Sequence, residues 1–315
     1  MISTPGFTIK SVFGCVPKRI VSNMEACSAL VSEEKAAAVV KTTGFSERRI
    51  VDTGTTVEDL MLPAAKAALE GVDPESVGAV VAVTFSAPRR FPGVAVRIAA
   101  ELGLPQSVAS FDLSMACSGY PYGLFVAAQF AAASRNHVLF LDGDVQSAFV
   151  DDKDVNTMAV MGDAAAATLV APGADDAPMA HFDFMSLGSL GDALFCDAQG
   201  PVKMDGFGVF RFVATDVTAF LRRFIAETGE HPEVFAPHAA NMYMIRQLSA
   251  ALGLEDRLVS AGDRYANTGS CSVALALAST PVCGRTLLAG YGAGLSASAA
   301  FVDVPHDLRR GIIER

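Results

Sequence analysis

Cys117 is the residue of this 315-residue chain whose surroundings point most directly to chemistry. It lies in the run A-C-S-G-Y, between an apolar segment at 108–113 that predicts a strand and one at 124–133 that predicts a helix. A thiol at the amino end of a buried helix faces the positive end of the helix dipole, which favours the nucleophilic thiolate. Taken alone, the residue also fits a plain core cysteine, because free cysteine packs as a small hydrophobe.

Two more polar residues follow or precede apolar elements in a similar way. His238 lies in P-H-A-A-N directly after a predicted strand at 234–236, and ligands bind at the carboxyl ends of strands in open α/β sheets. Asn267 lies in R-Y-A-N-T-G-S, ahead of a wholly apolar helix. Each has a structural alternative: His238 as a loop or capping histidine, and the run around Asn267 as a helix N-cap.

Glycine-rich turns are the remaining candidates. The run G-Y-G-A-G-L occupies 290–295, but it lacks GxGxxG spacing and no helix is evident after it, so a dinucleotide site is weakly supported. A tight turn there can offer backbone N–H groups to an oxyanion, and a purely structural turn is the alternative. The run G-D-A-A-A-A at 162–167 is interpreted as a structural turn into a core strand.

The elements that position these residues alternate along the chain. Strands are predicted at 77–84, 138–141, 164–170, 234–236 and 286–289, and helices at 57–69, 94–102, 213–225 and 242–252. This alternation predicts an α/β fold with parallel strand pairing and with helices on the sheet faces.

The two halves of the chain resemble each other. Around both Cys117 and Asn267, a loop of small residues precedes an apolar helix and then a buried strand. We therefore predict a duplicated α/β unit, with the first half at 1–171 carrying the cysteine and the second at 172–315 carrying the histidine and the asparagine. The alternative is that βα units in general have this appearance.

Composition bounds the function classes. Apolar residues make up 51% and charged residues 18%, below the roughly 25% that is usual, which excludes a disordered chain. The formal charge of −10 argues against nucleic-acid binding. The six cysteines form no CxxC pair, so no metal site is predicted.

The segments that bear on location are the N-terminus and the two long uncharged runs. The N-terminus does not have the pattern of a signal peptide. The runs at 113–134 and 286–302 are interrupted by glycine, proline or polar residues, so neither is predicted to cross a membrane. We expect a cytoplasmic protein with reduced thiols.

The order of these motifs resembles β-ketoacyl-ACP synthase III of the thiolase superfamily. The match extends along nearly the whole chain and includes G-F-S-E-R-R-I at 44–50, F-P-G-V-A at 91–95, D-L-S-M-A-C-S-G at 112–119, G-D-A-A-A at 162–166, P-H-A-A-N at 237–241, D-R-Y-A-N-T-G-S at 263–270 and G-A-G at 292–294.

The resemblance implies a thiolase-like five-layered αβαβα fold built from two duplicated halves, usually in a homodimer. It implies that Cys117 is the acylated nucleophile and that His238 and Asn267 promote decarboxylation of a malonyl thioester and stabilise the enolate. The backbone N–H groups of Cys117 and of the turn at Ala293 and Gly294 would bind the oxyanion. Neither a metal nor an organic cofactor is implied.

The resemblance also assigns positions that contact the substrate. Phe91 matches the residue that crosses the dimer interface to wall the acyl pocket, and Asn241 and Tyr243 match substrate-binding positions. The implied activity is acyl transfer from an acyl-CoA or acyl carrier protein thioester, followed by decarboxylative Claisen condensation. The alternatives are non-decarboxylating acyl transfer to an alcohol or amine, and a non-catalytic partner subunit.

The sequence departs from the family at the CoA entrance. The chain has no tryptophan, and Val155, Thr157 and Tyr243 stand in the region where the family has phosphate-binding arginines. We therefore expect an enzyme of a specialised pathway that takes acyl groups from a carrier protein or an unusual thioester. The candidate docking charges for an acidic carrier are Arg89, Arg90, Arg97, Arg222, Arg223 and Arg246.

Overall fold

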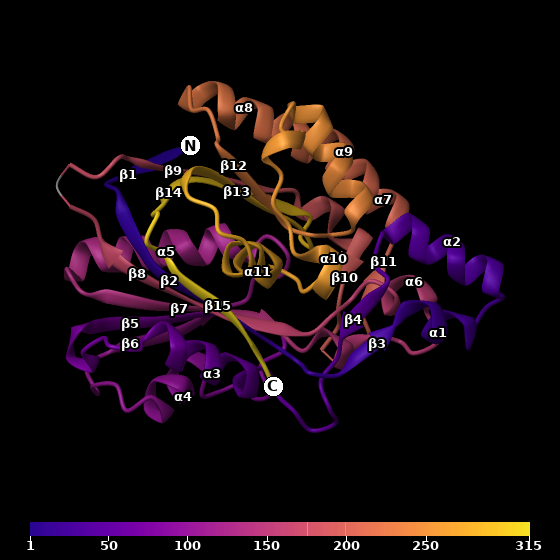
Figure 1. Cartoon of the computed structure of the whole chain (residues 1–315), viewed down its shortest axis with the longest axis horizontal. Coiled ribbons are helices and arrows are strands. Elements are labelled where there is room, and N and C mark those ends of the chain that lie inside the picture. The colour runs from indigo at the N-terminus through magenta and orange to yellow at the C-terminus, as the bar shows by residue number, and fades with distance from the viewer. Residues whose placement is uncertain (175, 199) are drawn as a thin grey trace.

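Two β-sheets lie face to face, with helices between them and on both outer faces (Figure 1). The computed structural model describes residues 1–174, 176–198 and 200–315. The layers follow in the order αβαβα, so the predicted five-layered α/β fold is confirmed.

The first sheet has the order β15–β2–β8–β7–β5–β6 and the second β1–β9–β14–β13–β12. The strands of the first are β2 Phe7–Val16, β5 Val77–Val83, β6 Ala109–Leu113, β7 His137–Asp144, β8 Ala164–Pro172 and β15 Arg309–Glu314. Those of the second are β1 Ile2–Thr4, β9 Ala180–Ser186, β12 Val234–Pro237, β13 Gly284–Gly292 and β14 Ser296–Val304. Two small ribbons pair β3 Ile20–Ser22 with β4 Glu47–Arg49, and β10 Leu194–Phe195 with β11 Lys203–Met204.

The helices occupy three layers and the loops beside them. Outside the first sheet lie α3 Val57–Ala68 and α4 Val94–Glu101; between the sheets lie α5 Gly119–Ser134 and α11 Cys271–Ser279; outside the second sheet lie α7 Gly206–Phe212, α8 Thr218–Thr228 and α9 Met242–Leu252. The shorter or peripheral helices are α1 Asn23–Ser28, α2 Glu33–Thr43, α6 Val155–Met158 and α10 Gly262–Tyr265. The helix predicted at 213–225 is α8 preceded by a π-helical turn at Val213–Val217.

Strand pairing repeats between the two sheets. β2, β8, β7 and β5 pair antiparallel, antiparallel and parallel in turn, and β9, β14, β13 and β12 repeat this sequence of directions. The predicted duplication is thus visible in the topology. The prediction of parallel pairing is wrong for β2–β8 and β8–β7 in the first sheet and for most of the second sheet. Strands β13 and β14, for example, are joined by a short turn that leaves no room for the crossover that parallel strands require.

The central helices are buried from both sides. Helix α11 presents eight of its nine residues as buried, since one sheet covers each of its faces. Helix α5 approaches β7 so closely that a Cβ on Gly123 would lie 2.3 Å from the Phe140 ring. Small residues in these helices therefore set the spacing between the sheets, and with it the place where the helix amino ends meet.

Each sheet includes a strand from the opposite end of the described chain. Strand β15 pairs parallel with β2 in the first sheet, from Arg309 opposite Ser11 to Glu314 opposite Val16. Strand β1 pairs with β9 in the second sheet. The two halves are therefore interlocked by their ends.

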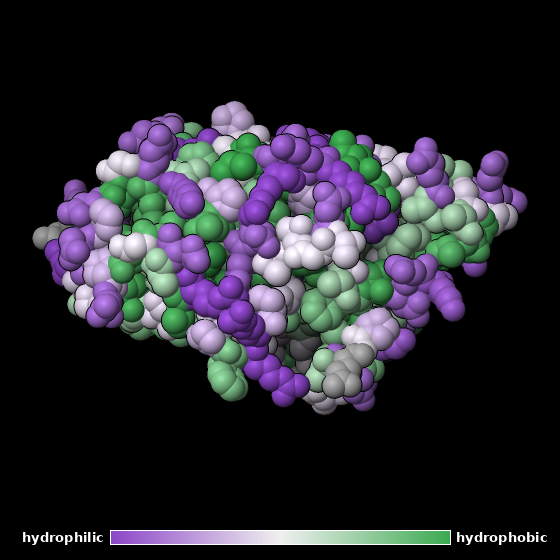
Figure 2. Space-filling view, turned by 90° about the horizontal axis from the view of Figure 1, so that it is seen from below, coloured by the Kyte–Doolittle hydropathy of each residue, from purple (hydrophilic) through white to green (hydrophobic). Residues whose placement is uncertain are grey.

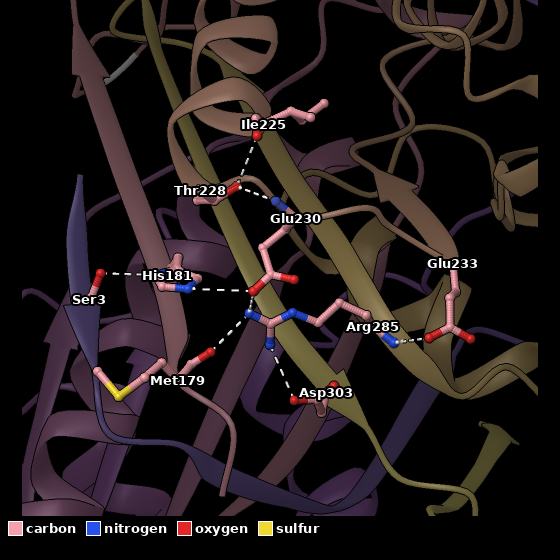
Figure 3. A network of polar contacts seen from close by, with 9 residues as sticks. All are labelled: Ser3, Met179, His181, Ile225, Thr228, Glu230, Glu233, Arg285 and Asp303. Atoms are coloured by element: carbon pink, nitrogen blue, oxygen red, sulfur yellow. Dashed lines mark hydrogen bonds and ion pairs between the residues drawn. The ribbon is translucent and has the colours of Figure 1, made fainter.

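A polar network joins the ends of neighbouring strands in the second sheet (Figure 3). The Arg285 guanidinium on β13 donates to Glu230 Oε1 at 2.6 Å, to the Met179 carbonyl at 2.9 Å and to Asp303 Oδ2 at 3.2 Å. His181 Nε2 on β9 lies 3.5 Å from the same Glu230 oxygen. One cation thus connects the loop after α8 to strands β13 and β14 and to the segment before β9.

Within the described residues, none of the helices combines the length and the apolar character that crossing a bilayer demands.

Candidate active site

A cavity of about 810 Å³ opens beside the amino ends of the two central helices. Its walls include Cys117, His238 and Asn267, which come from three distant segments of the chain. Ala293 and Gly294, from the turn between β13 and β14, line it as well. The structure therefore brings together the predicted nucleophile, its two polar partners and the predicted oxyanion turn.

Cys117 lies just before α5, where Gly292 on the facing strand permits close contact. A Cβ on Gly292, whose φ is +147°, would lie 2.7 Å from Cys117 Cβ and 3.1 Å from its Sγ. Burial raises the pKa of the Cys117 thiol to about 11. Burial therefore opposes the tendency of the helix amino end to favour the thiolate.

Backbone N–H groups surround the sulfur. Those of Ala293 and of Cys117 itself lie near the sulfur and partly offset the effect of burial on the thiol pKa. The turn that holds Ala293 is fixed by Ser296, whose Oγ donates to the Ala293 carbonyl at 2.6 Å and lies 2.8 Å from Ser118 Oγ. Two backbone N–H groups thus lie beside the Cys117 sulfur.

His238 follows β12 and is only 1% exposed. Its Nδ1 lies 2.8 Å from the Gly269 carbonyl and 2.9 Å from Ser272 Oγ. Because a carbonyl only accepts, Nδ1 carries the ring proton in the neutral state and Nε2 is left as an acceptor. Burial lowers the pKa of His238 to about 4, so the ring is neutral at pH 7.

The side chain of Asn267 is held by two hydrogen bonds. Its Oδ1 accepts from the Gly269 N–H at 2.9 Å, and its Nδ2 donates to the Ala240 carbonyl at 3.3 Å. A carboxamide nitrogen has two protons, so one N–H remains for a ligand in the cavity. This geometry suits an electrically neutral donor to a developing negative oxygen.

Two buried carboxyl groups stand at the end of β7. Asp144 Oδ1 accepts from the Thr84 hydroxyl at 2.7 Å and from the Phe85 and Ser86 N–H groups at 2.8 and 3.0 Å. Burial raises the pKa of Asp144 to about 6 and that of Asp142 further. Asp144 thereby fixes the loop that carries Phe85 into the cavity wall.

The predicted substrate-binding residues have separate positions. Asn241 lines the cavity, and its side-chain oxygen caps α9 by accepting from the Met244 N–H at 2.7 Å. Tyr243 is 49% exposed and stacks on Phe210, with ring centroids 6.2 Å apart, and it is not part of the cavity wall. Phe91 is 85% exposed and also lies outside that wall within a single chain.

The candidate docking arginines also separate. Arg89 and Arg90 are exposed and belong to the cavity wall. The other candidates lie elsewhere: Arg97 pairs with Glu58 at 2.6 Å and Arg223 with Asp183 at 2.7 Å, while Arg222 donates to the Ala251 carbonyl and Arg246 is outside the cavity wall.

Sequence reasoning did not single out the residues that support the catalytic candidates. Ser272 accepts from the Ala239 N–H at 3.0 Å and touches His238 Nδ1, and Tyr291 donates its hydroxyl proton to the His238 carbonyl at 2.8 Å. Gln146 donates to the Asn267 carbonyl. The only signal was position: Ser272 lies near the predicted N-cap run, and Gln146 lies five residues after the strand predicted at 138–141.

Family comparison agrees with this geometry. Residues 111–188 match the family model of 3-oxoacyl-[acyl-carrier-protein (ACP)] synthase III, and residues 228–304 match the model of its C-terminal part. The chain is 33% identical over 311 residues to β-ketoacyl-[acyl-carrier-protein] synthase III 2 of Streptomyces coelicolor, which covers 94% of this chain and 93% of that protein.

Solved structures agree in fold. A 3-oxoacyl-(acyl-carrier protein) synthase from Burkholderia xenovorans superposes with a TM-score of 0.94 at 27% identity, covering 100% of this chain and 98% of that one. A priming β-ketosynthase from a polyketide biosynthetic pathway superposes with a TM-score of 0.86 at 30% identity, covering 96% and 97%. Similarity thus spans both halves.

Proposed function

Because the chain belongs to the 3-oxoacyl-[acyl-carrier-protein] synthase III family and is a condensing acyltransferase, we propose that Cys117 is the residue that carries the acyl group. The observation that supports this assignment most is the convergence of Cys117, His238 and Asn267 on one cavity, with the N–H groups of Cys117 and Ala293 at the sulfur. The reaction is decarboxylative Claisen condensation of the acyl group with a malonyl thioester.

Acylation begins with a neutral thiol and a neutral imidazole. His238 Nε2 accepts the Cys117 proton as the sulfur attacks the thioester carbonyl, and the N–H groups of Cys117 and Ala293 bind the oxyanion. The donor's carbon–sulfur bond then breaks, and the departing thiolate takes the proton from His238. Proton transfer during attack removes the need for a free thiolate, which a pKa of about 11 makes scarce at pH 7.

Condensation follows at the same place. Loss of CO2 from the malonyl thioester leaves its electron pair in an enolate, and the free Nδ2–H of Asn267 donates to the enolate oxygen. His238 adds a second donor only when Nε2 is protonated, since Nδ1–H is committed to Gly269. The enolate carbon attacks the acyl carbon, and Cys117 leaves as a thiolate that takes up a proton.

We also propose the setting of this reaction. Phe91, exposed in one chain, crosses a homodimer interface to wall the partner's acyl pocket. The units 1–171 and 172–315 are the duplicated halves, and the protein works in the cytoplasm. The oxyanion turn includes Gly294, while Asn241 and Tyr243 contact the donor at the entrance.

The entrance favours a carrier protein or an unusual thioester over CoA as the donor. Val155, Thr157 and Tyr243 stand in the region where the family has phosphate-binding arginines, and these side chains cannot make bidentate contacts to phosphate. The pathway is therefore a specialised one.

Substitution of Cys117 by serine tests the assignment. We expect acyl-enzyme formation and CO2 release to fall by at least about a thousandfold, because a serine hydroxyl is far less nucleophilic than a cysteine sulfur in a site without a strong base. Intact-protein mass spectrometry after incubation with a panel of acyl-CoAs and acyl carrier proteins measures the acylation, and labelled malonyl thioester measures CO2. An unchanged acylation signal in Cys117→Ser contradicts the proposal.

A further inference from the structure

Gln146 lies two residues beyond the carboxyl end of β7 and faces the same cavity as Asn267. It is 2% exposed. Its Nε2 donates to the Gly162 carbonyl at 2.8 Å and to the Asn267 carbonyl at 2.7 Å. A carboxamide nitrogen carries two protons, so this side chain spends its full donor capacity on two backbone groups.

The backbone that Gln146 contacts is also held by two backbone hydrogen bonds. Asn267 N–H donates to the Val160 carbonyl at 3.1 Å, and the Asn267 carbonyl accepts from the Gly162 N–H at 2.8 Å. Gln146 joins the two backbone segments that these bonds connect, one at Gly162 and one at Asn267. Through it, the position of Asn267 depends on the end of β7 in the other half of the chain.

The backbone conformation of Ala266, just before Asn267, shows why the hydrogen bonds from Gln146 are needed. Its φ is +59° and its ψ is −152°, in a region that is populated almost only by glycine. The residue is 1% exposed. A residue with a Cβ keeps this backbone only where its neighbours impose it, and the bonds on Asn267 do so.

We propose that Gln146 is a positioning residue for Asn267, which holds the strained Ala266–Asn267 backbone so that the Asn267 carboxamide faces the enolate oxygen. The inference rests on the proposed role of Asn267 in decarboxylation. Gln146 acts through Asn267 and not through Cys117, so it affects condensation and leaves acylation alone.

The first test replaces Gln146 by methionine, which has a similar length and no donor. We expect condensation, measured as labelled CO2 release, to fall roughly tenfold or more, because small displacements of a positioned group have effects of that order. Acylation of Cys117, measured by mass spectrometry, stays within about twofold of the wild type. Gln129→Leu, an exposed change on α5, is the matched control and leaves both rates unchanged.

The second test uses the strain. Ala266→Gly adopts the same backbone without a Cβ, so it needs the hydrogen bonds from Gln146 less. In the Gln146→Met background, Ala266→Gly restores most of the lost condensation. In the Asn267→Ala background, Gln146→Met causes no further loss, because the residue acts only through Asn267.

A third variant guards against misfolding of Gln146→Met, which thermal unfolding detects. Gln146→Glu keeps the size; its carboxylate has no donor, and its protonated form has one. Its condensation rate therefore rises as pH falls relative to that of the wild type.

Equal losses of acylation and condensation in the Gln146 variants, or full additivity with Asn267→Ala, overturn the positioning role. Failure of the proposed function is a separate result, since the wild-type enzyme would then release no CO2.

Discussion

The reactivity of Cys117 is set by competition between burial and backbone dipoles. Burial raises its pKa to about 11 in spite of two N–H groups at the sulfur. Alkylation by iodoacetamide, which requires the thiolate, should therefore rise roughly tenfold per pH unit between pH 7 and 10.

Mass spectrometry of the Cys117 peptide over that pH range measures the rate, and the peptide with exposed Cys196 serves as the internal reference. A plateau of Cys117 alkylation near pH 7 would instead mean that the helix amino end dominates.

Some of the candidate site residues could be predicted from the sequence, and others could not. Cys117, His238 and Asn267 could be selected because each is a reactive or polar residue beside an apolar element. Gln146 could not be selected, since its role is a contact with a residue 121 positions away, and a single glutamine after a strand has no distinguishing pattern. The preference of Nδ1 for Gly269 is equally invisible, and it decides which nitrogen of His238 is basic.

Helix α5 begins two residues after Cys117, and a glycine sets the distance of this helix from the sheet. A Cβ at position 123 would lie 2.3 Å from Phe140 on β7 and 2.9 Å from Val83 on β5. Gly123→Ala should therefore lower the free energy of unfolding by about 1–3 kcal/mol through overpacking, in spite of the better helix propensity of alanine.

Urea unfolding measures this change. The control is Ala133→Gly, an exposed change near the far end of the same helix, which should cost only about 1 kcal/mol. A stabilised Gly123→Ala variant would contradict the close packing.

The elements themselves were largely predictable from residue patterns. The runs at 77–84 and 242–252 appear as β5 and α9 with nearly the predicted bounds. The prediction of parallel pairing failed because β2, β9 and β14, each of which pairs antiparallel with at least one neighbour, were not among the predicted strands. The π-helical turn before α8 also has no signal in the periodicity of its apolar residues.

The molecule as a whole has few charges, and Figure 2 shows apolar side chains interspersed with polar ones on the face seen from below Figure 1. Charged groups that are half-buried then matter more for stability. The hydrogen bond from Arg285 holds the pKa of Glu230 below its usual range, so its ionised form stabilises the fold above the unfolded pKa near 4.5. This contribution is lost as pH falls through the folded-state pKa.

Glu230→Gln should thus be less stable than the wild type at pH 7 by about 1–2 kcal/mol, and the difference should shrink towards zero as pH falls through the folded-state pKa of Glu230. Chemical denaturation of both proteins across that pH range measures the difference. Asp256→Asn, on the neighbouring surface turn, is a control with the same loss of charge. A difference that stays constant with pH would rule out the ion pair as its source.

The pairing of β15 with β2, and of β1 with β9, also affects the order in which the sheets form during synthesis. As the chain leaves the ribosome, β2 emerges early, yet its parallel neighbour β15 is made about three hundred residues later. Contacts between residues so far apart form slowly. Until β15 is made, the edge of the first sheet beside β2 therefore stays unpaired. Such an edge can pair with a wrong strand, and a chaperone can shield it. A fragment that ends before β15 leaves the first sheet incomplete, and we expect it to be inactive.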